Sequence, residues 1–517
     1  MDIPKRGAWL VLLFCLPSTL LGGNPRTPDS WIPARWPGGP LELYQRDKAR
    51  DQSKAPTADT EVRTAIADWY DPATLRLLDG SPVNCLLLTW SAGASAELER
   101  QQQQLVGTYA TEAHRRGVAI LGLVYPGADP SQFVPAAIAA HLDGLALEGG
   151  FPGDLIGQVT TAVASSGSPM VVVPIVTAPA RTAATPVSAV EGVSPSARNL
   201  SDMGIRGAPS SEPWIQSNIW LVRSFRLTPD WRPLWIGYQP DSGTASDYAR
   251  SVADAAVAGG RWIVALDDRM RAKLRRRDAA ALATWSGIGE CLKFAEDHAE
   301  WRSFVPFGNL GIILDPASKD PDMADEYLKL VARRQVPYRL IARTGFNAAS
   351  LAGLRAVLAT ELAPPTDAER TILQAFAENG GVLVAGPSWG NPPKDQPFAE
   401  VSVGKGRAVV YKDPDPESVA RDMRDLLSHK EAGFAAFNVP SVITYASGGP
   451  GKRLLVQLLN YSDFPATAIT IRVSGSFKTA RLFTPGAAPL SLDMDAADGQ
   501  IDVAIPKLSL WGAVLLE

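Results

Sequence analysis

The stretch Asp143-Gly-Leu-Ala-Leu-Glu148-Gly-Gly-Phe151 indicates the fold of this chain. It reads as a short buried strand that ends on a carboxylate and is followed at once by two glycines. In a parallel α/β barrel, the active site lies at the carboxyl ends of the strands. Glu148 is therefore a candidate catalytic acid. A strand-end glutamate that caps a helix or pairs with an arginine is a comparably common alternative.

Apolar runs alternate with helical stretches on both sides of this strand, which is typical of a parallel sheet covered on both faces. Eight such runs occur over the length that a (β/α)8 TIM barrel needs, so the fold class predicted is α/β with a TIM barrel first. In this count Glu148 ends the fourth strand. The expected strands are 41–44, 83–90, 118–125, 144–148, 170–176, 218–222, 233–238 and 262–266.

The rest of the chain predicts two further domains. Residues 308–411 alternate strands with helices at 323–334 and 367–378, which indicates a small doubly wound α/β domain. Residues 404–406 lack the spacing of a phosphate-binding loop and predict a hairpin turn. After residue 453, apolar and polar residues alternate between turns, which favours a C-terminal β-sandwich. Its expected strands are 454–460, 468–473, 480–483, 501–505 and 510–516.

The amino end has the order of a secretory signal peptide. Lys5 and Arg6 precede the apolar run 8–16, and Gly22-Gly23 follow it. No later run is long and apolar enough for a membrane helix. We therefore expect a secreted or periplasmic bacterial protein with a signal peptide at 1–23. Its predicted domains are a barrel at 24–303, an α/β domain at 304–428 and a sandwich at 429–517.

Composition excludes several classes of function. The net charge of -4 comes without a basic stripe, so nucleic acid is not an expected partner. The four histidines are scattered, which disfavours a zinc site, and no cofactor is expected. Beyond the predicted signal peptide only Cys85 and Cys291 remain, and a disulfide between them is left open. No Gly-x-Ser-x-Gly elbow supports a serine hydrolase.

Barrel, doubly wound domain and sandwich in this order resemble the beta-galactosidase-like retaining glycosidases, whose middle domain looks like a glutamine amidotransferase. Two regions carry the resemblance. Leu310-Gly-Ile-Ile-Leu-Asp315 through Ala375-Phe-Ala-Glu-Asn-Gly-Gly-Val-Leu-Val-Ala385 is similar to that middle domain. Leu459-Asn-Tyr-Ser462 and Ile505-Pro-Lys-Leu508 are similar to the closing sandwich. The middle domain lacks a nucleophilic cysteine, which excludes amidotransferase chemistry.

The resemblance implies a glutamate acid/base at the end of the fourth strand and a glutamate nucleophile at the end of the seventh. Glu148 matches the first position. The seventh strand instead ends at Tyr238-Gln239-Pro240, and an amide cannot act as the nucleophile. This departure from the pattern puts retaining catalysis in doubt.

Other carboxylates are candidates for the second catalytic group. Glu191 lies in the stretch 177–217, which we expect to be a long loop after the fifth strand, and Asp267 and Asp268 end the eighth strand. Glycoside hydrolysis needs two carboxyls, about 5 Å apart for retention or roughly 6.5–9.5 Å apart for inversion. Glu148 with Glu191, or Glu148 with Asp267, are the pairs expected. Helix capping remains the favoured alternative for the two aspartates.

Three aromatic residues close expected strands and are candidate sugar-stacking groups: Trp90, Tyr125 and Tyr238. Gln239 and Asp268 are the expected polar contacts to sugar hydroxyls. Each aromatic residue taken singly is more often part of a core.

Three functions follow as hypotheses. The first is an exported glycoside hydrolase that cleaves O-glycosidic bonds of an oligo- or polysaccharide by acid/base catalysis. The second is a glycosidase-like carbohydrate-binding protein that has lost catalysis, which Gln239 favours. The third is an exported assembly subunit that forms a homo-oligomer through its middle domain.

Overall fold

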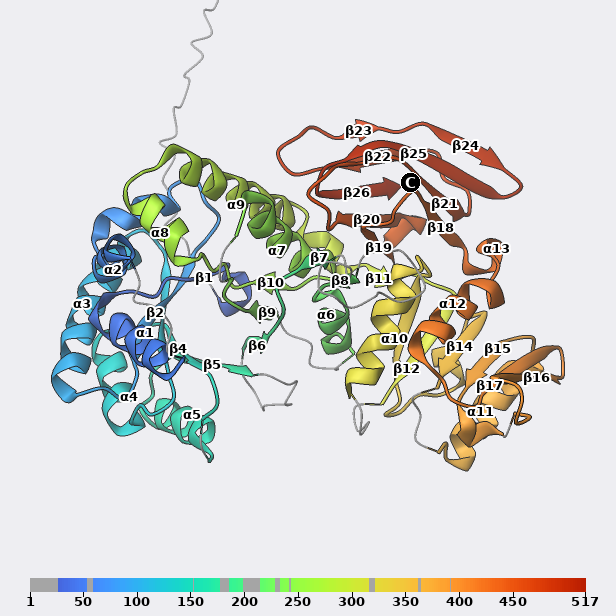
Figure 1. Cartoon of the computed structure of the whole chain (residues 1–517), viewed down its shortest axis with the longest axis horizontal. Helices are drawn as coiled ribbons and strands as arrows, with labels where there is room; N and C mark the ends of the chain where they lie inside the picture. The colour runs from blue at the N-terminus through green and yellow to red at the C-terminus, as the bar shows by residue number, and fades with distance from the viewer. Residues whose placement is uncertain are drawn as a thin grey trace, which may run out of the picture.

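The computed structural model describes residues 27–53, 59–151, 153–176, 186–198, 214–227, 233–240, 243–315, 321–360, 364–390 and 392–517 (Figure 1). The predicted signal peptide and most of the stretch 177–217 lie outside these residues.

Eight parallel strands form the first sheet, in the order β1-β2-β3-β4-β5-β6-β9-β10. The sheet closes on itself because Ala34 bridges Val264 in parallel. The amide of Arg35 donates to the Val264 carbonyl at 2.8 Å, and the amide of Val264 donates to the Pro33 carbonyl at 3.0 Å. The predicted TIM barrel is thereby confirmed. Its strands are β1 (Pro33–Arg35), β2 (Cys85–Ser91), β3 (Ala119–Val124), β4 (Gly144–Glu148), β5 (Val171–Val176), β6 (Ser188–Glu191), β9 (Leu234–Gly237) and β10 (Arg261–Trp262).

Helices surround the barrel, and their sequences start them at defined places. Ser95 caps α3 by accepting from the Leu98 amide, and Thr244 and Asp247 form a capping box at α7. Two helices stand between β1 and β2. The helices are α1 (Gly39–Ser53), α2 (Thr60–Ala67), α3 (Ala96–Arg115), α4 (Pro130–Ala139), α5 (Leu155–Ser165), α6 (Ile219–Phe225), α7 (Ala245–Val257), α8 (Asp268–Arg275) and α9 (Ala279–Asp297).

Two predicted strands are wrong. Residues 41–44 belong to α1 and residues 218–222 lie at and in α6. A short apolar run does not distinguish a strand from a helical turn, and the true strands, β1 and β6, have only three and four residues. β1 and β6 take the places of the two wrong strands in the count. Glu148 therefore still ends the fourth barrel strand, and Gln239 still follows the seventh.

Alternate residues of each strand face the barrel interior. The interior cluster contains Leu87 of β2, Leu123 of β3, Ala146 of β4, Ile175 of β5 and Ala189 of β6. Their neighbours, such as Leu86 and Leu88, pack outward in the larger cluster beneath the helices. This alternation decides which side chains at the strand ends point into the barrel mouth.

The second sheet has the order β13-β12-β14-β15-β17-β16, parallel except for the last strand. This is the doubly wound domain predicted from the sequence. Its edge strand β16 turns into β17 through Gly404, whose φ of +58° lies in the left-handed region that glycine adopts readily, so the expected hairpin is confirmed. The elements are β12 (Leu310–Leu314), α10 (Pro321–Arg333), β13 (Tyr338–Ala342), β14 (Ala356–Ala359), α11 (Asp367–Glu378), β15 (Val382–Ala385), β16 (Phe398–Val403), β17 (Gly406–Tyr411) and α12 (Pro416–Leu426).

Two antiparallel sheets form the C-terminal sandwich, in the orders β11-β19-β20-β26-β22-β23 and β18-β21-β25-β24. All five expected strands are present, and apolar side chains of both sheets share one core. The short helix α13 (His429–Ala432) precedes it. The strands are β11 (Val305–Pro306), β18 (Phe434–Phe437), β19 (Val442–Gly448), β20 (Leu454–Asn460), β21 (Ala466–Ser474), β22 (Ala480–Phe483), β23 (Leu490–Ser491), β24 (Met494–Ala497), β25 (Gln500–Leu508) and β26 (Trp511–Leu516).

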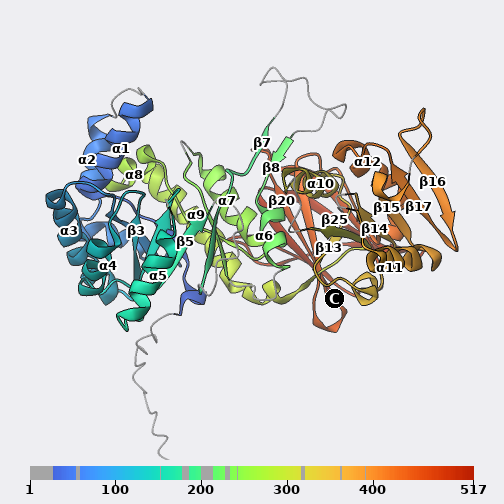
Figure 2. The same ribbon diagram turned by 90° about the horizontal axis from the view of Figure 1, so that it is seen from below.

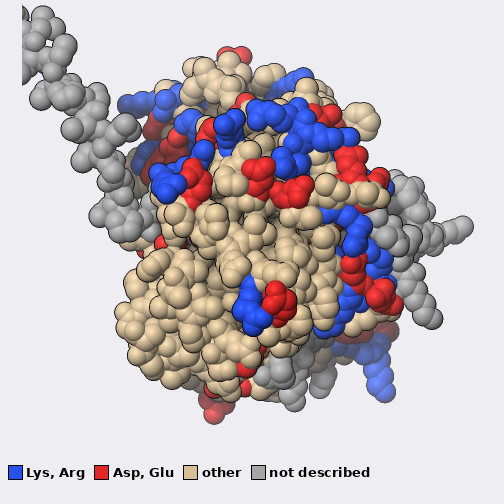
Figure 3. Space-filling view, turned by 90° about the vertical axis from the view of Figure 1, so that its left-hand side faces the viewer, with Lys and Arg blue, Asp and Glu red and all other residues tan. Residues whose placement is uncertain are grey.

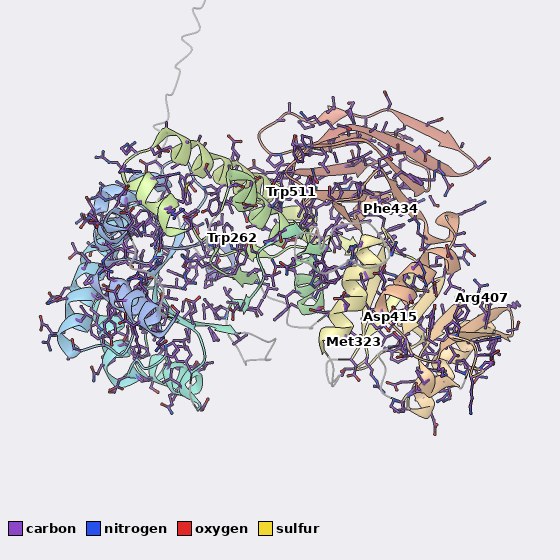
Figure 4. The ribbon with its side chains drawn as sticks, viewed as in Figure 1. Trp262, Met323, Arg407, Asp415, Phe434 and Trp511 are labelled. Atoms are coloured by element: carbon purple, nitrogen blue, oxygen red, sulfur yellow. The ribbon has the colours of Figure 1, made fainter. Side chains whose placement is uncertain are left out.

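Specific contacts join the three parts, with the barrel at one end of the molecule and the second sheet at the other (Figure 2). Tyr461 donates to the buried Asp254 of α7 at 2.6 Å. Trp511 meets Phe294 of α9 edge-on, with ring centroids 4.7 Å apart, where the sandwich meets the barrel helices (Figure 4). Arg223 of α6 donates to the Tyr338 carbonyl at 2.5 Å and lies over the Tyr338 ring. The barrel is therefore packed against both following domains.

One face of the barrel end carries acidic and basic side chains interspersed over its upper part and a broad area with few charges below (Figure 3). The stretch 117–180, which includes α4 and α5, contains no lysine or arginine. Among the described residues, no helix is long and apolar enough to cross a membrane, and no group of three metal-ligating side chains comes together.

Glu296, near the end of α9, links the last barrel strand to the short 3-10 helix that follows α9 (Ala299–Ser303). Its carboxylate accepts two hydrogen bonds from Arg261 at 3.1 Å each and two from Arg302 at 2.6 and 3.0 Å. Burial works to raise the pKa of Glu296, but the two arginines outweigh it and lower the pKa to about 2. The ionised Glu296 therefore stabilises the fold fully above pH 4.5, its ordinary pKa. This stabilisation is lost as the pH falls through about 2.

We expect Glu296→Gln to lower the free energy of unfolding at pH 7 by about 2 kcal/mol, as for hydrogen bonds to a charged partner. The difference in free energy of unfolding between the variant and the unaltered protein should become smaller as the pH falls from 4.5 to 2. Urea unfolding at several pH values measures it. Asp297→Asn is the matched control, because Asp297 makes only an exposed ion pair with Lys293. A gap that stays constant down to pH 2 would contradict the assignment.

Candidate active site at the mouth of the barrel

Five polar side chains lie on the interior face at the carboxyl ends of barrel strands or just beyond them: Arg35, Tyr125, Glu148, Glu191 and Gln239. Tyr125, Glu148, Glu191 and Gln239 each follow an interior residue of their own strand by two positions, namely Leu123, Ala146, Ala189 and Gly237. A spacing of two returns a side chain to the same face of a strand. These residues therefore converge on the barrel mouth, where barrels place their chemistry.

An ion pair between Arg35 and Glu148 spans the mouth from β1 to β4. Nη1 of Arg35 donates to Oε1 of Glu148 at 2.6 Å, and Nη2 donates to Oε2, so the pair is bidentate. The side chains are 16% and 21% exposed. After Glu148 the chain turns through Gly149, whose φ of +103° is accessible mainly to glycine. Both carboxylate oxygens of Glu148 are thus engaged in the structure.

The pKa of Glu148 is raised above its ordinary value. Burial is the largest cause, Arg35 opposes it, and the negative charges of Glu42 and Glu191 reinforce it. Arg35 therefore favours the ionised form of this carboxyl group, whereas burial and the two neighbouring carboxylates favour its protonated form. A raised pKa is what a general acid requires at neutral pH.

Glu42 of α1 lies behind this pair and is only 4% exposed. It accepts hydrogen bonds from Arg46 Nε at 2.7 Å, Thr89 Oγ1 at 2.8 Å and Tyr125 Oη at 3.2 Å. Burial works to raise its pKa, but Arg46 and Arg271 outweigh this and lower it. Glu42 is thus a fixed negative charge at the edge of the mouth.

Glu191 occupies a different place from the one expected. The sequence suggested a long loop, whereas the structure has Glu191 as the last residue of β6, the sixth barrel strand. Its side chain is exposed, and its charge acts on Glu148. The register makes Glu148 level with Ile175 and Ile175 level with Ala189, two residues before Glu191. Glu148 and Glu191 therefore face the same interior space across β5.

Asp267 and Asp268 are held by structural contacts. Asp267 caps α8 by accepting from the Met270 amide at 2.9 Å, and it also accepts a hydrogen bond from Tyr248. It is 6% exposed. Asp268 pairs with Arg46 and with Arg271, the latter at 2.7 Å. Helix capping, the alternative favoured for these two residues, is what the structure contains for Asp267.

Two of the three aromatic candidates do not lie in the mouth. Trp90 is on the outward face of β2, fully buried, and donates from Nε1 to the Phe133 carbonyl of α4 at 3.1 Å. Tyr238 is on the outward face of its strand, and its ring stacks on Trp262 at 5.5 Å. The two-residue alternation turns both rings away from the interior, although Tyr238 also borders the narrow pocket at the mouth. Tyr125 is half-buried and lies inside.

Gln239 stands where the resemblance implies a nucleophile. Its Nε2 donates to the Leu266 carbonyl at 3.4 Å. An amide at this place leaves Glu148 and Glu191 as the two carboxylates at the strand ends on the interior face, within the described residues.

A narrow pocket opens between Arg35 and Glu148, and no water-sized space is left in it. The ion pair fills the space between the two strand ends. A larger cavity of about 310 Å³ lies elsewhere, between α10, α12 and β18. The narrow pocket is lined by Arg35, Leu87, Leu123, Glu148, Ile175, Gly237, Tyr238 and Ile263.

Arg35 and Glu42 were not among the residues expected to form a site. Arg35 follows the Pro/Gly-rich arm, and recognising Pro33–Arg35 as the first strand would have placed it at a carboxyl strand end. Glu42 gives no signal in the sequence, because it sits in the first turns of a helix and only the tertiary packing buries it.

No protein-family model and no curated protein sequence matches the chain. Solved structures do. Alpha-L-fucosidase isoenzyme 2 from Paenibacillus thiaminolyticus is similar with a TM-score of 0.51 at 11% identity, over 86% of this chain and 95% of that one. Exo-beta-1,4-mannosidase Op5Man5 from Opitutaceae bacterium strain TAV5 has a TM-score of 0.44 at 10% identity, over 78% and 95%. Beta-galactosidase from Bacillus circulans sp. alkalophilus has a TM-score of 0.36 at 8% identity, over 82% and 68%.

At these identities the likeness concerns the fold. The match to the fucosidase extends over nearly the whole of both chains, so it includes the later domains as well as the barrel. The predicted resemblance to glycoside hydrolases is confirmed at this level.

Proposed function

We propose that this protein is an exported glycoside hydrolase that cleaves an O-glycosidic bond with Glu148 as the general acid and Glu191 as the general base. The observation that supports it most is the position of these two carboxylates. They end β4 and β6 on the interior face of a glycosidase-like barrel, and the charge of one raises the pKa of the other. Export rests on the signal-peptide pattern of residues 1–23.

In the proposed reaction, Glu148 gives its proton to the glycosidic oxygen as the bond from that oxygen to the anomeric carbon breaks. Glu191 takes a proton from a water molecule whose oxygen bonds to the anomeric carbon. The products are a free sugar and the released alcohol, and the two carboxyl groups end with exchanged protonation states. Solvent then restores them.

The strand order favours inversion at the anomeric carbon. β4 and β6 are separated by one strand, so their backbones are about 10 Å apart, and inward side chains come closer than that. This agrees better with the roughly 6.5–9.5 Å of inverting enzymes than with the 5–5.5 Å of retaining ones. The amide at Gln239 also removes the nucleophile that a retaining relative would use.

A panel of 4-nitrophenyl α- and β-glycosides, with neutral and acidic sugars, tests the proposal. We expect turnover of at least one glycoside and expect proton NMR to show the opposite anomer first in the released sugar. Release of the same anomer would contradict the assignment of Glu191 as a base. Absence of turnover across the panel, in protein that binds sugar, would favour the second candidate.

That second candidate is a carbohydrate-binding protein without catalysis. Two observations favour it: both oxygens of Glu148 are engaged by Arg35, and the seventh strand leads into an amide. It predicts sugar binding that is unaffected when Glu191 is replaced with glutamine.

A further inference from the structure

We propose that the sugar bound beside the scissile bond is a uronate, and that its carboxylate displaces Glu148 from Arg35. This inference rests on the proposed function, and it names the substrate class of the same site. It starts from an obstacle: the bidentate pair occupies both oxygens of the carboxyl group that must donate a proton.

The guanidinium of Arg35 is suited to exchange one carboxylate for another. Its planar fork binds any carboxylate bidentately, so a sugar carboxylate forms the same two hydrogen bonds that Glu148 forms. A neutral sugar offers only hydroxyl groups, which compete poorly with a carboxylate for an arginine. Opening the pair therefore favours an acidic sugar over a neutral one.

Arg35 is the arginine available for this exchange among the described residues that line the pocket. Arg46 and Arg271 lie behind it and are committed to Glu42, Asp268 and the Pro37 carbonyl. The Arg35 side chain is 16% exposed, so an incoming carboxylate can contact its edge and take the place of Glu148 as the pair opens.

The exchange would also prepare the acid. Once Arg35 is taken by the substrate, the remaining influences on Glu148 are burial and the charges of Glu42 and Glu191, and all three raise its pKa. The exchange therefore favours the protonated form of Glu148, which is the donor that the reaction needs. Binding of a uronate is thereby coupled to proton uptake.

Isothermal titration calorimetry at pH 8 in two buffers of different ionisation enthalpy tests this coupling. The probes are D-glucuronate and D-galacturonate, with glucose and galactose as neutral counterparts. We expect a uronate to bind with net proton uptake and the neutral sugars to bind more weakly with none. Equal affinity for neutral and acidic sugars, or uronate binding without proton uptake, overturns the inference.

Variants test the contributions of Arg35 and Glu148 to uronate binding separately. Glu148→Gln should bind the uronate about 10-fold more tightly and without proton uptake, because no carboxylate competes for Arg35. Arg35→Gln should weaken uronate binding about 100-fold, and Arg35→Lys should weaken it about 10-fold because the fork is lost. Unchanged uronate affinity in Arg35→Gln contradicts the proposal.

Arg269→Gln is the matched control, since Arg269 is an exposed arginine in the first turn of α8. The double variant Arg35→Gln/Glu148→Gln removes both charges together, so weak binding there does not reflect an unpaired buried glutamate. If neutral glycosides are turned over and uronates are not bound, the inference fails while the proposed function stands. If uronates bind with proton uptake and nothing is turned over, the proposed function fails instead.

Discussion

Glu148→Gln is expected to lower kcat about 1,000-fold on a glycoside with a poor leaving group, which is the middle of the range for loss of a general acid. The amide keeps the shape of the side chain and still accepts a hydrogen bond from Arg35, so the barrel mouth should keep its form. What it loses is the proton that the leaving oxygen requires.

The dependence on the leaving group makes this prediction specific. A 2,4-dinitrophenolate departs with little protonation, so on that substrate the loss should shrink to about 10-fold. Steady-state kinetics on a series of aryl glycosides measures how kcat depends on the leaving group. Glu97→Gln is the control, because Glu97 lies exposed on α3 and pairs only with neighbours on its own helix. An equal loss on good and poor leaving groups would assign Glu148 another role.

The second large effect is expected at Glu191. Glu191→Ala should lower kcat about 1,000-fold irrespective of the leaving group, because activation of the water is lost while protonation of the leaving oxygen remains. Glu191 ends β6 with an exposed side chain, so its removal leaves no cavity in the core.

Added azide should restore turnover in Glu191→Ala, because azide attacks the anomeric carbon without first losing a proton. The product expected is a glycosyl azide of inverted configuration, identified by NMR. The same Glu97→Gln variant serves as the control. An azide adduct of retained configuration, or full activity without azide, would contradict the role of Glu191.

The sequence predicted the parts of the fold that depend on long, strongly patterned segments. The strands at 83–90, 118–125 and 170–176 and the helices at 323–334 and 367–378 lie where they were expected. Strands β1 and β6 were missed because three or four residues do not establish a period. The position of Glu148 was still correct, because each missed strand was replaced in the count by a nearby helical run.

The candidate site was less predictable, for two physical reasons. A residue at a strand end faces the mouth only if it lies an even number of positions from an interior residue of the same strand. Tyr125 and Glu148 meet this condition, and Trp90 and Tyr238 do not. The face on which a residue lies can be predicted from the sequence once the strand bounds are known. The partner of Glu148 could not be predicted from the sequence, since Arg35 is 113 positions away and only the packing of the strands into one sheet brings it there.

Barrel closure has a consequence for the order in which the protein folds. The bridge between Ala34 and Val264 joins residues 230 positions apart, so it is among the contacts with the highest loop-closure cost. Neighbouring strands such as β1 and β2 or β2 and β3 come together from shorter range, so the pairing of β1 with the far end of the sheet is the most costly step in closing the barrel. Before that step the sheet is open along one side, and the ring of strand ends that forms the mouth is complete only after it.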